Sequence, residues 1–145
     1  GTLPISAHGK GLGCLLNGSS TIFTNCVLAG NSVEHTTGYI FYGGAIYADG
    51  GELALIDCTV TNNFINGNLN NAGYSAYGYG GAVYTKNAAV RMTGCTIARN
   101  YVRTRYYAAT GGALGFENGT AVLEHCTFMT NYTVRSENYT GGVAG

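Results

Sequence analysis

A tandem repeat is the feature that most constrains this chain. Related tetrapeptides open at residues 43–46 (GGAI), 80–83 (GGAV), 111–114 (GGAL) and 141–144 (GGVA). In each complete copy a cysteine lies fifteen residues after the first glycine, and an asparagine lies five residues after that cysteine. Counting back from Cys26 and Asn31 places a divergent first copy at Gly11. The frames 11–31, 43–63, 80–100 and 111–131 therefore align without a gap, which is typical of a stack of equivalent units.

All variation in length falls between the frames. The connecting segments are 32–42, 64–79, 101–110 and 132–140. We expect them to be variable loops that leave one edge of a single domain spanning residues 1–145. Residues 141–145 open a fifth coil that is incomplete in this sequence.

Apolar residues within the frame recur with period two. Leu53 and Leu55 alternate with Ala54 and Ile56, and the other copies keep apolar or small side chains in the same columns. No segment has ten or more residues at helical spacing, so three short strands per copy are predicted. Repeats of 30–37 residues then predict an all-β fold, a parallel β-solenoid in which each strand pairs with its equivalent one coil away.

In such a stack, equivalent residues form columns with a spacing of about 4.8 Å. One column is predicted to be an internal amide ladder, in which each carboxamide bonds to its neighbours: Asn31, Asn63, Asn100 and Asn131. A second column is predicted to fill a narrow corner with small side chains: Cys26, Cys58, Cys95 and Cys126. Parallel Cβ vectors suit a disulfide poorly, so a ladder of thiols is favoured over bridges.

Charge and hydropathy narrow the classes of partner. Seven basic and seven acidic residues give a formal net charge of zero, so neither nucleic acid nor an anionic membrane is an expected partner. No stretch approaches the roughly 20 apolar residues of a membrane span. With 46% apolar residues the chain is expected to bury an ordinary core.

The acidic residues and histidines do not predict catalysis. A glycosidase needs two carboxylates about 5–10 Å apart on one face, and no two acids share a column in adjacent coils. The three histidines have no spacing typical of a metal site. We therefore expect no enzyme activity, no metal and no cofactor.

Tyrosines concentrate between the frames. Ten of the twelve lie there: Tyr39, Tyr42, Tyr74, Tyr77, Tyr79, Tyr101, Tyr106, Tyr107, Tyr132 and Tyr139. Because the connecting segments leave the same corner, these rings are predicted to form one aromatic edge. Such an edge can contact sugar or protein, or it can pack over the glycine turns as a satellite core. Asn-x-Ser/Thr patterns also make Asn17, Asn118 and Asn138 possible N-glycosylation sites.

The paired signatures suggest a family. The glycine tetrapeptides at 43–46, 80–83 and 111–114, together with Phe128-Met129-Thr130-Asn131, resemble the repeats of the chlamydial polymorphic membrane proteins and related repeat proteins. Looser versions of the second signature end at Asn31, Asn63 and Asn100. The resemblance implies a secreted or surface-displayed right-handed parallel β-helix, often the stalk of an adhesin.

Three functions follow in order of preference. The first is an extracellular structural protein, a subunit of a fibre or surface assembly whose β-helices stack head to tail as a homo-oligomer, because a solenoid without end caps exposes unpaired backbone. The second is a surface adhesin or glycan-binding module that uses the tyrosine edge. The third is a polysaccharide-active enzyme. The expected location is extracellular or at the cell surface.

Overall fold

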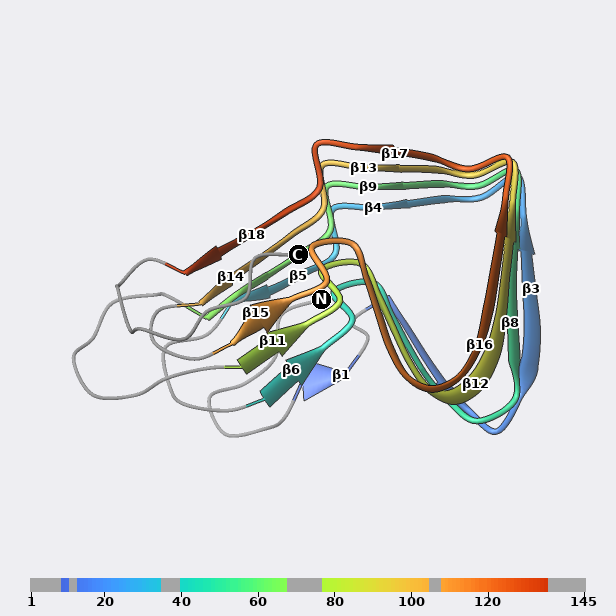
Figure 1. Ribbon diagram of the computed structural model, residues 1–145, viewed down its shortest axis with the longest axis horizontal. Coiled ribbons are helices and arrows are strands. Elements are labelled where there is room, and N and C mark those ends of the chain that lie inside the picture. Colours follow the sequence, from blue (N-terminus) through green and yellow to red (C-terminus); the bar gives the residue numbers. More distant parts are fainter. Residues whose placement is uncertain (1–8, 11–12, 35–39, 68–76, 105–107, 136–145) are drawn as a thin grey trace.

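The computed structural model describes residues 9–10, 13–34, 40–67, 77–104 and 108–135, and every element in these ranges is a β-strand. The all-β class predicted from the sequence is therefore confirmed for the described residues. The described strands form four sheets in which neighbouring strands are parallel (Figure 1).

Two frame sheets contain the strands of the repeat. The bent sheet consists of β2 (Cys14–Asn17), β3 (Ser20–Thr24), β7 (Ile46–Asp49), β8 (Glu52–Ile56), β12 (Val83–Thr93) and β16 (Leu114–Glu124). The short frame sheet consists of β4 (Val27–Ala29), β9 (Thr59–Thr61), β13 (Thr96–Ala98) and β17 (Thr127–Met129). In the third and fourth copies the first two predicted strands are one continuous strand of 11 residues.

Register follows the repeat. Thr59 of β9 pairs with Val27 of β4 and with Thr96 of β13, and Thr96 pairs with Thr127 of β17. Each of these residues holds the same position in its frame, so each copy of the repeat adds one layer to the frame sheets. The columns expected from the sequence are present in this register.

Two wing sheets are formed, apart from β1, by segments that we expected to be loops. The first wing sheet contains β5 (Ser32–Glu34), β10 (Phe64–Asn66), β14 (Tyr101–Thr104) and β18 (Tyr132–Arg135). The second contains β1 (Gly9–Lys10), β6 (Ile40–Tyr42), β11 (Tyr77–Tyr79) and β15 (Ala109–Thr110). The expectation of loops is wrong for these residues. Backbone groups next to a stacked coil form strand pairs there too, since an unpaired edge is costly.

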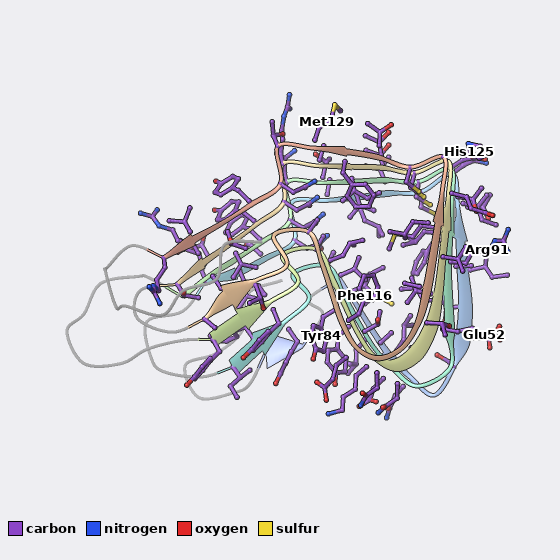
Figure 2. All side chains as sticks on the ribbon, viewed as in Figure 1. Glu52, Tyr84, Arg91, Phe116, His125 and Met129 are labelled. Carbon is purple, nitrogen blue, oxygen red and sulfur yellow. The ribbon has the colours of Figure 1, made fainter. Side chains whose placement is uncertain are left out.

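The two pairs of sheets enclose separate apolar cores. The frame core is built from residues such as Leu53, Leu55, Met92 and Ile97, all at most 1% exposed. A second core between the wing sheets contains Val33, Phe41, Ile65, Val102 and Ala109. Figure 1 shows the frame on one side of the molecule and the wings on the other. Outward residues of the frame, among them Glu52 and Arg91, point away from the enclosed core (Figure 2).

Corners of the coil recur at fixed frame positions and use a left-handed backbone. One corner column has φ between 51° and 66°: Asn25, Asp57, Gly94 and His125. A second has φ between 51° and 69°: Gly30, Asn62, Arg99 and Thr130. Glycine and asparagine adopt this region at small cost, whereas a β-branched residue such as Thr130 does so under strain.

The glycine pair of the repeat has a steric origin. The first glycine has a positive φ, which is 66° at Gly80. The second has no room for a side chain, because a Cβ added to Gly81 would overlap the carbonyl oxygen of Gly112 and lie 2.6 Å from that of Tyr101. The following small residue, Ala82, is fully buried. The motif is therefore the point where frame and wing backbones meet most closely.

We predict that Gly81→Ala lowers the free energy of unfolding by about 3 kcal/mol or more, as expected for overpacking against backbone that cannot move aside. Gly30→Ala is the control: it also replaces a frame glycine by alanine, but no atom lies within 4 Å of the added Cβ. The control carries only the left-handed conformational cost of about 1–2 kcal/mol. Urea unfolding measures both; equal losses would contradict the steric account.

Candidate functional site

The asparagine column forms a hydrogen-bond ladder through the frame. The Nδ2 of Asn31 donates to Oδ1 of Asn63 at 2.9 Å, and the next two steps to Asn100 and Asn131 are both 3.0 Å. The backbone N–H of each of the first three asparagines donates to the same oxygen of the next, at 2.9–3.0 Å. Every step thus joins adjacent coils through two hydrogen bonds.

The second amide hydrogen bonds backward. Nδ2 of Asn63, Asn100 and Asn131 donates to the carbonyl oxygen of Leu28, Val60 and Ile97, respectively, at 2.8–2.9 Å. Asn63 and Asn100 are fully buried, and no buried side-chain nitrogen or oxygen among the described residues lacks a partner. The ladder therefore satisfies polar groups where the chain turns from the short frame sheet into the wing.

The cysteine column lies along the opposite end of the short frame sheet. All five cysteines of the chain are free thiols, and Cys58 and Cys95 are 1% exposed. The thiol of Cys58 donates to the carbonyl oxygens of Phe23 at 3.4 Å and Ile56 at 3.2 Å. Burial raises the pKa of the Cys95 thiol, which disfavours the reactive thiolate. These thiols pack as small core side chains.

The fourth coil exposes side chains that belong to the core face. Leu123 is 42% exposed although its column partner Met92 is fully buried, and Phe128 is 45% exposed above the fully buried Ile97. Phe116, 47% exposed, continues the column of Ala48 and Thr85. We call Phe116, Leu123 and Phe128 the end face. All three side chains lie in columns whose members in the preceding coil are buried.

Five of the ten predicted contact tyrosines are described, and they fall on two different wing sheets. Tyr101 and Tyr132 stack 5.1 Å apart in the first wing sheet, with Phe64 4.7 Å below Tyr101. Tyr42, Tyr77 and Tyr79 lie on the second wing sheet. The described tyrosines therefore form two groups on two sheets rather than one edge. Outside the described residues lie Tyr39, Tyr74, Tyr106, Tyr107 and Tyr139.

An aromatic corner joins the second wing sheet to the bent sheet. Tyr42 lies 4.6 Å from Tyr84 and 5.3 Å from Tyr79 between ring centroids, and Tyr47 stacks on Tyr84 at 5.8 Å. Tyr47 and Tyr84 are only 3% and 5% exposed. Sequence reasoning missed these two rings, although both follow the first glycine of their frame by four residues. Packing over the glycine turns thus accounts for this group.

A polar cluster borders the aromatic corner. Glu117 accepts hydrogen bonds from the hydroxyl of Tyr84 at 2.5 Å and forms an ion pair with Lys86 at 2.7 Å. Hydrogen bonding to Lys86 and then to Tyr84 lowers the pKa of Glu117. Burial, followed by the Glu117 hydrogen bond, raises the pKa of Tyr84. The column Asp49, Lys86, Glu117 alternates in charge, which suits adjacent coils.

Two of the possible glycosylation sites are described. Asn17 ends β2, and Asn118 lies at a corner of β16 with φ of 51°. Both side chains are exposed, while Asn138 lies outside the described residues. A glycan at either position would project away from the frame core.

The described ranges contain no group of three or more His, Cys, Asp or Glu residues that could hold a metal ion. They also contain no helix with the length and hydropathy needed to cross a membrane. No protein-family model matches the chain, and no curated protein and no solved structure matches it.

We predict that Asn100→Ala lowers the free energy of unfolding by about 3–5 kcal/mol, because it leaves two buried donors of Asn63 and the Val60 carbonyl without partners. Asn17→Ala makes the same change at an exposed position and should alter stability by less than about 0.5 kcal/mol. Chemical denaturation measures both free energies of unfolding. If the loss for Asn100→Ala is no larger than the loss for Asn17→Ala, the ladder does not stabilise the fold.

A second prediction concerns pH. The pKa of Glu117 is lowered in the folded state from its ordinary 4.5, so its interactions stabilise the fold above that value and are lost as pH falls through the folded pKa. Glu117→Gln should therefore melt below the parent chain at pH 7, and the difference should shrink toward pH 3. Glu52→Gln, on the outward face of β8, is the control. A difference that persists at pH 3 would contradict this account.

Proposed function

We propose that the chain is a right-handed parallel β-helix and a structural subunit of an extracellular fibre or surface assembly, in which copies stack head to tail. The end face carries this proposal. It combines three large apolar side chains, each more than 40% exposed, with the outer edges of β16 and β17.

A further coil is the partner that this surface fits best. Within the chain, coils meet through parallel strand pairing, apolar columns and the asparagine ladder. A second copy that presents its first coil to the fourth would repeat all three contacts. A parallel sheet edge pairs with another strand at little cost, because both edges already hold extended backbone. Continued stacking would build an open filament.

The extracellular location rests on the resemblance of the repeats to those of the chlamydial polymorphic membrane proteins. The features that carry the resemblance are the glycine tetrapeptide that opens each frame and the asparagine that ends it. The exposed Asn17 and Asn118 are compatible with glycosylation in such a location.

An adhesive or glycan-binding module is the second candidate, and one observation favours it. Tyr132 is 48% exposed at the end of the ring column that begins with Phe64 and Tyr101. A tyrosine face of this kind suits contact with sugar or protein. The same ring also lies in the coil that bears the end face, so its exposure equally suits a stacked copy.

The test is a pair of variants on one strand. Leu123 and Val122 are neighbours in β16 with similar exposure, 42% and 46%, but Leu123 faces the core column and Val122 the outside. Leu123→Arg should abolish filaments in negative-stain electron microscopy and leave monomers in sedimentation. Val122→Arg should still assemble, because its side chain faces outward and is not part of the end face.

Two results would count against the proposal. A parent chain that stays monomeric at high concentration would remove the fibre and shift preference to the adhesive module, to be tested against glycans. Equal loss of filaments in both variants would show that the end face is not the contact surface.

A further inference from the structure

The asparagine ladder has a direction. At every step the amide nitrogen and the backbone N–H belong to the earlier coil, and the accepting oxygen belongs to the later coil. An asparagine side chain has both a donor and an acceptor, so a column of them can run in one direction only. The column runs from Asn31 to Asn131.

The two ends of the ladder therefore differ. By the repeat of the geometry, Asn131 turns its donor side away from Asn100, and Asn31 turns its acceptor side away from Asn63. Both residues are partly exposed, whereas Asn63 and Asn100 are fully buried. One end of the frame presents donors and the other presents an acceptor.

We infer that Asn131 of one copy donates its backbone N–H and its amide to Oδ1 of Asn31 of a second copy, and that this bond sets the polarity and register of the stack. The inference rests on the proposed end-to-end assembly. Two fourth coils brought together would oppose donor to donor, and two first coils would oppose acceptor to acceptor. Either arrangement leaves polar groups unsatisfied at the junction, which costs about 1–3 kcal/mol for each group.

The apolar columns agree with this polarity. In the same register, Leu123 meets Phe23 and Phe128 meets Leu28, all of them core-face residues of their coils. Large and medium side chains thus alternate across the junction, as they do between Leu55 and Phe23 within the chain. The first coil of a second copy is for this reason a closer match than a second fourth coil, which would place Phe128 against Phe128.

Cross-linking tests the polarity. Val27 and Thr127 occupy one outward column and are both exposed. Val27→Cys and Thr127→Cys are made separately, with the partly exposed Cys14, Cys26 and Cys126 replaced by alanine. A bismaleimide that spans about 10 Å, or roughly two coil spacings, is added to each variant and to their mixture. Cross-linked dimers are expected only in the mixture.

Different outcomes of this experiment would contradict the inferred polarity and the proposed function. Dimers in Thr127→Cys alone would overturn the polarity and leave the fibre standing. Assembly with no cross-link in any sample would overturn the register. Absence of assembly in the parent chain, measured by sedimentation, would instead remove the proposed function.

A substitution at the ladder tests the hydrogen bond itself. Asn131→Asp keeps the acceptor for Asn100 but removes the amide donor, both at the junction and in the internal hydrogen bond to the Ile97 carbonyl. The dissociation constant of the assembly should rise about tenfold or more, the equivalent of one hydrogen bond. Asn17→Asp is the control for added charge. If Asn131→Asp changes the melting midpoint of the dilute monomer but not the dissociation constant, its role is internal only, and the inference fails.

Discussion

Parallel pairing of each strand with its equivalent in the next coil is the constraint on which the rest of the structure depends. It requires every coil to follow the same path, so each corner must fall at the same frame position and use the same left-handed backbone. It also turns single residues into columns, so that Leu55 packs on Met92 and Asn63 bonds to Asn100. The contribution of any one residue to the stability of the fold therefore depends on the coil above and the coil below it.

The same constraint explains why core-face side chains are exposed in the fourth coil. A column is complete only where coils lie on both sides, and the exposure of Leu123 and Phe128 reflects the lack of a described coil beyond β16 and β17. Core-face residues that are fully buried one coil earlier become an apolar surface without any change in local structure. The asparagine ladder adds direction to that surface. In the proposed assembly, the structural role and the interaction surface are thus two consequences of one repeat.

In the wings, stacking between neighbouring coils also aligns segments that carry no repeat motif. Ser32, Phe64, Tyr101 and Tyr132 each follow a ladder asparagine, and the ladder holds them one above another. Strand pairing and ring stacking then extend outward from that fixed point. On the other side of the wing core, the glycine pair brings the chain back into the frame close enough for Tyr42 to pack against Tyr84. Tyr42, Tyr47, Tyr79 and Tyr84 pack against one another at this junction.

The amino-acid sequence by itself determined the frames, the period-two strands and the asparagine and cysteine columns, because these depend on residue type at a fixed spacing. Only the tertiary structure decided that the ends of the connecting segments are strands, and that the described tyrosines of these segments divide between the two wing sheets. Those contacts involve segments whose length varies from copy to copy. No periodic signal records them, and they form because paired backbone and buried rings are more stable than exposed ones.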